Sequence, residues 1–242
     1  MKLIKLDAID STNEFLKGLS NKQNLENFTV VSAETQTKGK GQMGATWTSE
    51  PSKNLIMSVL VKDFLEDIVQ IFNLNVVVAL AVVQVLENYK IPNLSIKWPN
   101  DIMSDNKKIG GILIENSIKS EGSIQSIVGL GLNVNQTNFD MLPKASSLAA
   151  ICSKVFDKEE ILVAICNDIQ NKIAASKIVL PELWEIYRSK LYKIGVPMAF
   201  SNSSGEHFMG IILGVSAFGK LRIMLHDDSV AEFDIKEIQM LY

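Results

Sequence analysis

The spacing of apolar and polar residues changes once along the chain, and the change divides it into two regions. Up to residue 192, apolar runs of strand length alternate with longer stretches of helical spacing. After Gly195, short strand-like runs are separated by turns such as Ser-Ser-Gly and Ala-Phe-Gly. This pattern predicts an α+β fold, a mixed sheet flanked by helices, for residues 1–192 and a small β-barrel domain for residues 193–242.

Strands in the first region are predicted from apolar runs bounded by turn residues. They are residues 3–6, 28–33, 54–61, 94–98, 112–115 and 126–134. Turns are predicted at residues 104–107 and at Glu121-Gly122. Two glycines in the run 126–134 indicate that a ligand or another backbone lies against that strand. In the second region the predicted strands are residues 197–201, 207–215, 220–225 and 230–233.

Helix starts are indicated by capping residues. Ser11 and Glu14 have the spacing of a capping box, which predicts a helix from there to about Leu19. Asp157 and Glu160 repeat that spacing before a helical pattern over residues 158–175. Pro181 is expected to start a further helix that runs through residue 191.

The run from residue 68 to residue 86 contains no charged residue and is long enough for a membrane span. Polar residues interrupt it, however, and valines crowd its middle. A helix buried in the core of the first region explains the run better, and a membrane span is the alternative.

Composition indicates a globular protein, with 47% apolar and 21% charged residues. The formal net charge of −3 gives no overall basic field that would favour nucleic acid. Cys152 and Cys166 lie in apolar, helix-like stretches without a ligand pattern, so buried, inert thiols are expected. No signal peptide opens the sequence, and a cytoplasmic location is the expectation.

A glycine-rich stretch, residues 35–47, separates two of the predicted strands. Gly39, Gly41 and Gly44 allow positive φ and close approach of the backbone to a ligand. Lys38 and Lys40 add positive charge, so the loop can form an anion-binding nest. A flexible hairpin connection is the alternative.

Further polar clusters lie at strand ends or in glycine-bearing strands. They are Ser11-Thr12-Asn13, Gln36, residues 97–101, Lys108 before Gly110-Gly111, and residues 129–133. Together they offer hydroxyl and amide groups for a polar ring, lysines for carboxylate or phosphate, and bare backbone for a planar base. An Asn-Asp pair could hold hydrated Mg²⁺. This set suits the activation of a small carboxylic acid by ATP.

The order of these motifs is more specific than any one of them. D-S-T-N, E-T-Q-T-K-G-K-G-Q-M-G-A-T-W, K-W-P-N-D, K-K-I-G-G-I-L-I-E and G-L-G-L-N-V-N follow one another along the chain. This order resembles biotin protein ligase, also called holocarboxylase synthetase, from about Leu6 to Leu148. The resemblance implies a class II synthetase-like catalytic domain and a small SH3-like β-barrel. Without a helix-turn-helix domain ahead of the catalytic domain, the chain is similar to the monofunctional type.

The resemblance also implies a two-step reaction. Biotin attacks the α-phosphorus of Mg-ATP to give biotinyl-5′-AMP and pyrophosphate, and a lysine of a biotin carboxyl carrier domain then takes the biotinyl group. ATP, Mg²⁺ and biotin are the expected small molecules, and the carrier is expected to be of the acetyl-CoA carboxylase type. No nucleic acid or membrane partner is expected, and a homodimer is compatible with the resemblance.

Site residues follow from the motif positions, as the resemblance implies them. The biotin-binding residues are Ser11, Thr12, Asn13, Gln36, Gly39, Lys40, Gly41, Gln42, Lys108 and Gly111. The residues expected at ATP and the adenylate are Lys40, Gln42, Trp47, Lys97, Asn100, Gly131 and Asn133. Lys108, Lys97 and Lys40 are expected to be catalytic by stabilising charge, and Asp101 to hold Mg²⁺. The alternatives are a solvated turn lysine for Lys108, a core tryptophan for Trp47 and a turn-shaping role for Asn100 and Asp101.

The glycine-rich stretch departs from the family pattern, because Lys40, Gln42 and Ala45 stand where arginines are usual. Lysine keeps the charge but not the planar, bidentate geometry of arginine. Other classes remain as alternatives. A lipoate–protein ligase would carry an Arg-Arg-x-x-Gly-Gly-Gly run, an octanoyltransferase a cysteine in the site loop, and a non-enzymatic biotin-sensing adaptor a DNA-binding domain.

Overall fold

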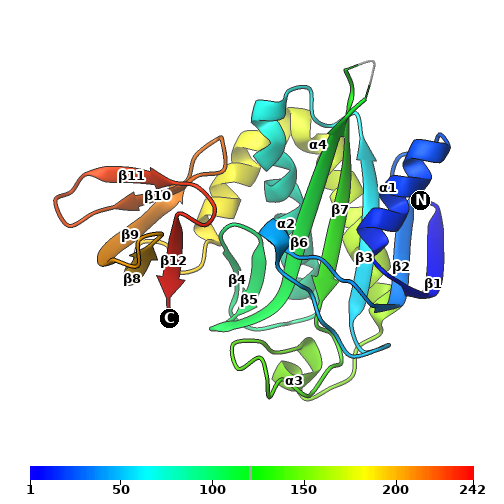
Figure 1. Cartoon of the computed structure of the whole chain (residues 1–242), viewed down its shortest axis with the longest axis horizontal. Coiled ribbons are helices and arrows are strands. Elements are labelled where there is room, and N and C mark those ends of the chain that lie inside the picture. Colours follow the sequence, from blue (N-terminus) through cyan, green and yellow to red (C-terminus); the bar gives the residue numbers. More distant parts are fainter. Residues whose placement is uncertain (120–121) are drawn as a thin grey trace.

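A seven-stranded mixed sheet forms the larger part of the fold (Figure 1). A computed structural model of the chain describes residues 1–119 and 122–242. The sheet order is β1-β2-β3-β7-β6-β5-β4, with β1 parallel to β2 and the other pairs antiparallel. Its strands are β1 (Leu3–Ile9), β2 (Val30–Gln36), β3 (Leu55–Lys62), β4 (Leu94–Lys97), β5 (Asp101–Ser104), β6 (Lys107–Ile118) and β7 (Ile124–Leu132). The mixed α+β prediction is confirmed, while Glu121 of the predicted turn lies outside the described residues.

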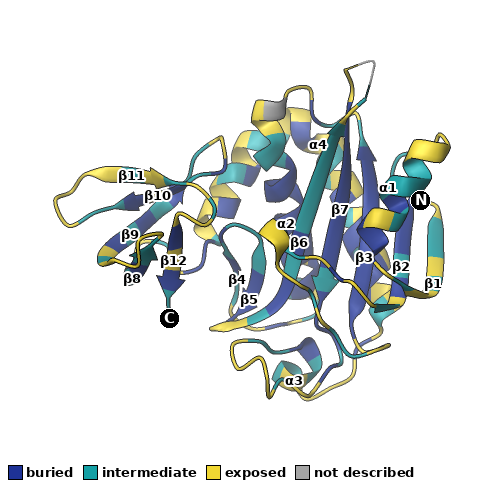
Figure 2. Cartoon of the chain, in the orientation of Figure 1, coloured by how far each residue is buried: buried dark blue, intermediate teal, exposed yellow. Residues whose placement is uncertain are grey.

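Both faces of the central strands are covered, as their continuous burial in Figure 2 shows. In β3, Val59 and Val61 pack into the large core with helices α2 (Ile71–Asn88) and α4 (Lys158–Ser189). Leu60 faces the other way, toward Leu16 of helix α1 (Thr12–Lys22). Successive side chains of a strand point to opposite faces, so one strand serves both layers.

Helix α1 begins where the sequence predicts. Ser11 is its N-cap and accepts a hydrogen bond from the Glu14 backbone N–H. The helix runs to Lys22 rather than ending near Leu19, and Gly18 lies inside it. Leu16 and Leu19 pack into the cluster beneath the helix, and this burial offsets the cost of one glycine, about 1 kcal/mol.

The apolar run 68–86 is a core helix of this fold. It forms one 3₁₀ turn, Ile68–Gln70, followed by α2. By length and composition alone α2 could cross a membrane, yet 67% of it is buried inside the fold. Residues along its middle, such as Val77 and Val82, have no exposed surface.

Pro181 does not start a new helix, and this prediction is wrong. Helix α4 is continuous from Lys158 to Ser189, with Pro181 on an exposed face. A proline inside a helix costs about 3 kcal/mol. The residues after it are held in line by Leu183, Trp184 and Tyr187, and both aromatic rings pack within 6 Å of Phe72 on α2. Each buried side chain of this size contributes about 1.5–3 kcal/mol, which outweighs the proline.

A second, antiparallel sheet has the order β11-β10-β9-β8-β12. Its strands are β8 (Pro197–Asn202), β9 (His207–Val215), β10 (Leu221–Met224), β11 (Val230–Phe233) and β12 (Ile238–Leu241). The predicted small β-domain is confirmed, with β12 added to the four predicted strands. The predicted boundary at Lys193 falls between α4 and β8, and the division into domains 1–192 and 193–242 stays a prediction.

The C-terminal sheet is docked firmly on the larger one. Phe200, Ile212 and Leu221 belong to the same core as α2 and α4. At the interface, the buried Trp98 Nε1–H donates to the Gly219 carbonyl at 2.8 Å. Gly219 has a φ of 84°, and a Cβ there would lie 2.4 Å from the ring of Phe72. The position of the C-terminal sheet relative to the larger sheet is therefore set by close packing.

Candidate functional site

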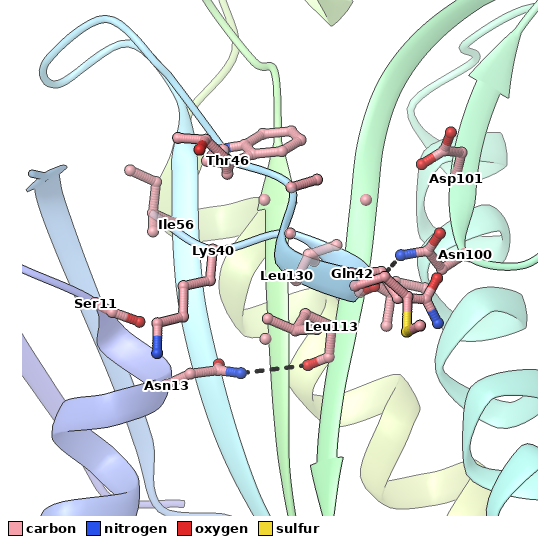
Figure 3. A pocket seen from close by; sticks show the side chains of 18 of the residues that line it. Ser11, Asn13, Lys40, Gln42, Thr46, Ile56, Asn100, Asp101, Leu113 and Leu130 are labelled. Carbon is pink, nitrogen blue, oxygen red and sulfur yellow. Dashed lines mark hydrogen bonds between the residues drawn. The ribbon is translucent and has the colours of Figure 1, made fainter. Parts of the chain in front are cut away.

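A cavity of about 290 Å³ lies on the face of the large sheet that carries α1. Its lining comes from α1, from the end of β2, from β3, β6 and β7, from the turn after β4 with the start of β5, and from the glycine loop, residues 37–47. Two residues of the C-terminal sheet, Ile235 and Lys236, also line it. Figure 3 shows Ser11, Asn13 and Lys40 gathered at one end, and Asn100 and Asp101 at the other.

Most of the residues that the sequence assigns to the site meet in this cavity. They are Ser11, Thr12, Asn13, Gln36, Lys40, Gly41, Gln42, Trp47, Asn100, Asp101, Lys108, Gly111 and Gly131. Gly39, Lys97 and Asn133 lie outside the lining. The roles assigned to individual residues stay predictions, but their convergence from separate stretches of sequence is a property of the fold.

Glycines of β7 make room for two side chains of the site. A Cβ on Gly129 would lie 2.4 Å from Asn13 Oδ1, and one on Gly131 would lie 2.4 Å from the indole of Trp47. The sequence predicts that a ligand or a backbone lies against this strand. In the structure Asn13 and Trp47 take that place, and the indole covers Gly131.

At the α1 end, a hydrogen-bond network fixes the amide of Asn13. Its Nδ2 donates to Glu115 Oε2 at 2.8 Å, and its Oδ1 accepts from the Ser58 hydroxyl at 2.6 Å. Ser58 is fully buried, and its Oγ lies 2.7 Å from Thr12 Oγ1. A carboxylate can only accept and a hydroxyl can donate, so these two neighbours decide which way the amide points.

The sequence prediction did not include Ser58 and Glu115, which the structure shows to hold Asn13 in place. Ser58 is the one polar residue between Leu55 and Val61 in β3, and Glu115 closes the K-x-G-G-I-L-x-E motif. A hydroxyl inside an apolar strand needs a polar partner when buried. That signal could have indicated Ser58 before the structure.

Gln36 connects the network to the glycine loop. Its Oε1 accepts from the Thr12 backbone N–H at 2.7 Å and lies 3.0 Å from Thr12 Oγ1. Its Nε2 is directed toward Gly39, where a Cβ would lie 3.0 Å from that nitrogen and 2.4 Å from the Trp47 carbonyl oxygen. No side chain fits at position 39, so Gly39 allows the loop backbone to pack closely against Gln36 and Trp47.

Lysines flank a carboxylate at the opposite end. Lys108 Nζ lies 2.5 Å from Asp101 Oδ1, and Lys97 Nζ lies 3.8 Å from Asp101 Oδ2. Lys108 also lies 5.8 Å from the centroid of the Trp47 ring. Lys97 is held behind the lining, with its ammonium 4.9 Å from the centroid of the Tyr242 ring. Lys108 belongs to β6 and faces the cavity.

Asp101 is the one carboxylate among the described residues that line the cavity. The part of the chain that the structure describes contains no group of three or more His, Cys, Asp or Glu that could hold a metal. Mg²⁺ is commonly held by one or two carboxylates together with substrate phosphates and water. Asp101 fits that pattern only in company with phosphate oxygens, and in this structure its oxygens face two lysines.

Asn100 and Asn133 use their amides on the backbone. Asn100 Nδ2 donates to the Ile112 carbonyl at 2.5 Å, which ties the turn after β4 to β6. Asn133 is buried and donates to the Ser146 carbonyl at 3.0 Å. The turn-shaping alternative for Asn100 thus has a structural basis.

The glycine loop crosses the cavity as a small hairpin. Lys40 pairs with Thr46 across it, and the Gly41 N–H donates to the Ala45 carbonyl at 2.7 Å. Gly44 has a positive φ of 82°, as the sequence allows. Its neighbour Met43 also has a positive φ, 53°. Gly41 has an extended φ of −109° and contributes space instead.

Two exposed ion pairs tie the loop to the start of α1. Lys40 Nζ lies 2.6 Å from Glu14 Oε1, and Lys38 Nζ lies 2.8 Å from Asp10 Oδ2. The hydrogen bond from Lys40 lowers the pKa of Glu14, and hydrogen bonds from Lys38 and Thr37 lower the pKa of Asp10. Glu14, predicted as the second half of a capping box, uses its carboxylate on the loop.

Neither cysteine lies in the cavity lining. Burial raises the pKa of the Cys166 thiol to about 12, so this thiol stays protonated. Cys152, expected to be buried, is only partly buried in the short helix α3 (Leu148–Cys152). The site loop therefore offers no cysteine for an octanoyltransferase reaction.

This fold places a cavity with polar lining residues between a glycine-bearing sheet and a lysine-containing loop. The chain belongs to the biotin/lipoate A/B protein ligase family, whose family model matches residues 6–133.

Several relatives match over most of the chain. The bifunctional ligase/repressor BirA of Bacillus subtilis is 30% identical over 90% of this chain and 68% of that protein. The biotin–[acetyl-CoA-carboxylase] ligase of Mycobacterium tuberculosis is 28% identical over 79% of this chain and 71% of its own length. The structure of biotin protein ligase from Aquifex aeolicus in complex with biotin and ATP superposes with a TM-score of 0.81 and 28% identity, covering 99% of this chain and 98% of that one.

Proposed function

We propose that this protein is a biotin–protein ligase that activates biotin with ATP and transfers it to a lysine of a carrier domain. One observation carries the proposal. In a chain of this family, the cavity brings the polar network around Asn13 opposite Lys108, beneath the glycine loop. The network offers hydrogen-bonding groups to a ureido ring, and the lysine offers positive charge to a carboxylate.

In the first half-reaction, a biotin carboxylate oxygen attacks the α-phosphorus of ATP and the bond to pyrophosphate breaks. Thr12, Asn13 and Gln36 hold the ureido ring at one end of the cavity. The valerate chain of biotin then directs the carboxylate toward Lys108, whose ammonium stabilises the charge that builds on the phosphoryl oxygens. When bound, Mg²⁺ neutralises phosphate charge, and Asp101 is the residue that would contact it.

In the second half-reaction, a lysine amine of the carrier attacks the carbonyl carbon of biotinyl-5′-AMP. An amide forms, AMP leaves with the bonding electrons, and the amine loses a proton. The residues of this site need no covalent intermediate with biotin. Their task is to orient both reactants, which can supply several kcal/mol of the barrier.

A carboxylase carrier domain is the proposed macromolecular partner, in line with the name of the Mycobacterium tuberculosis relative. We also propose a cytoplasmic location, which the two free cysteines support. The proposed reaction involves neither nucleic acid nor a membrane. We propose a homodimer as the oligomeric state to test.

The test compares biotin with lipoate. The protein is incubated with ATP, Mg²⁺ and one of the two acids, and pyrophosphate and the acyl-adenylate are measured; a carrier domain is then added. We expect adenylate and carrier labelling with biotin only. Adenylate formation with lipoate and none with biotin would overturn the proposal in favour of a lipoate ligase. Binding of biotin without pyrophosphate release would favour a sensing adaptor.

A further inference from the structure

The contact that joins the C-terminal sheet to the glycine loop points to a function for that sheet. We propose that Lys236 is a positioning residue that holds the glycine loop closed over the cavity, and thereby slows escape of the acyl-adenylate. The second half of this statement rests on the proposed function, whereas the closed loop itself does not.

The contact is direct. Lys236 Nζ donates to the Met43 carbonyl oxygen at 2.9 Å, across 193 positions of the sequence. Met43 lies in the 3₁₀ turn Gln42–Gly44 at the tip of the loop, and its side chain is largely exposed. Among the described residues, Lys236 makes the one hydrogen bond that joins this turn to an element outside the loop.

Lys236 is itself held in place by a tight turn between β11 and β12. The Glu237 N–H donates to the Asp234 carbonyl at 3.1 Å, and the Asp234 N–H donates to Glu237 Oε2 at 2.6 Å. Lys236 takes a φ of 73°, a left-handed conformation that a residue with a Cβ adopts at a cost. This turn brings Ile235 and Lys236 to the edge of the cavity.

The position of this turn relative to the cavity is fixed, because the C-terminal sheet packs closely against the rest of the fold. Trp98 and Phe72 pack against Gly219 at that interface. The donor of this hydrogen bond, Lys236, therefore belongs to a closely packed sheet. The acceptor, Met43, belongs to a loop whose residues are mostly exposed.

The loop is thus tied at two places. Lys38 and Lys40 attach its base to Asp10 and Glu14 at the start of α1, and Lys236 attaches its tip to the C-terminal sheet. The cavity passes between these attachments. Because the acceptor at the tip is a backbone carbonyl, the tether does not require a charged side chain in the loop. A loop without arginine can in this way use a cation from another element.

The principal test uses Lys236→Met, which keeps the apolar stem and removes the donor. Preformed biotinyl-AMP is bound and its dissociation rate is measured. An exposed contact of this kind corresponds to an increase in that rate of about two- to fivefold. Lys236→Arg should restore slow release. Arg222→Met, at an exposed arginine of the same sheet paired with Glu232, should behave as wild type.

A second measurement is independent of the reaction. Hydrogen–deuterium exchange of residues 37–47 is followed in the ligand-free protein, where Lys236→Met should exchange faster than wild type and Arg222→Met. Equal exchange and equal release in all three proteins, with unchanged Tm, would overturn the inference. Equal acceleration by Arg222→Met would also overturn it, because the effect would then belong to the whole sheet. If wild type forms no biotinyl-AMP, the proposed function fails, and the exchange result still decides whether Lys236 closes the loop.

Discussion

The two sides of the cavity are built from different kinds of contact. On the sheet side, Asn13, Ser58 and Glu115 form short hydrogen bonds among largely buried groups. On the loop side, Lys38, Lys40 and Lys236 make contacts that are mostly exposed to solvent. Buried, satisfied networks hold a single geometry, whereas exposed charge pairs contribute little and open easily. The sheet side is suited to recognising a ligand, and the loop side to admitting and releasing it.

The largest effect should come from the sheet side. Lys108→Ala removes the ammonium that stabilises charge at the reacting phosphorus, and we expect pyrophosphate release to fall by about 100-fold or more. Lys107→Ala, at the neighbouring exposed lysine, is the matched control and should retain activity. A rate for Lys108→Ala within about tenfold of wild type would remove this lysine from the chemistry.

Ser58→Ala tests the fixed network itself. Without this hydroxyl, the buried Asn13 Oδ1 lacks a hydrogen-bond donor, and the loss costs about 1–3 kcal/mol of free energy. We expect the KM for biotin to rise by about tenfold with a smaller change in kcat, since ground-state binding is affected first. Ser126→Ala also removes a buried hydroxyl, one that bonds Asn116 on the same sheet. If both variants raise KM equally, the effect is one of stability rather than of biotin recognition.

Gln42→Arg should strengthen the loop side. An arginine there can bind phosphate with two parallel hydrogen bonds, which a lysine cannot do. We expect biotinyl-AMP to leave about two- to tenfold more slowly, and labelling of an unrelated lysine-rich protein to decrease. Gln42→Lys separates charge from geometry and should have a smaller effect. Equal release from wild type and Gln42→Arg would show that other contacts, Lys236 among them, already suffice.

The smallest effect is expected from pH. The loop lowers the pKa of Glu14 from its ordinary 4.5 and that of Asp10 from 3.8. A lowered carboxylate pKa means that the contact is intact above the ordinary pKa and is lost as pH falls through the lowered one. Hydrogen exchange of residues 37–47, corrected for the intrinsic rate, should therefore be flat from pH 7 to about 5 and rise only in stronger acid. Loss of protection already at pH 6 would mean that another group controls the loop.

How far the sequence predicts this molecule depends on how local each feature is. The spacing of apolar residues and the capping residues predicted most strands and the starts of α1 and α4. Both signals depend on residues only a few positions apart. The continuity of α4 through Pro181 was not predictable, since it depends on aromatic packing against α2. The order of the motifs predicted most of the residues that line the cavity, whereas Lys236 belongs to none of these motifs. Its role arises only from the way the two sheets dock.

The alternation along β3 limits the changes that this strand can accept. Ser58 and Leu60 face α1 and the cavity, while Val59 and Val61 face the core beneath α2. Inserting or deleting a single residue would exchange these two sets, placing a hydroxyl in the apolar core and a valine in the recognition network. The strand should therefore tolerate many conservative substitutions but no change of length. Insertions during divergence of this protein are expected to collect in its loops, outside residues 55–62.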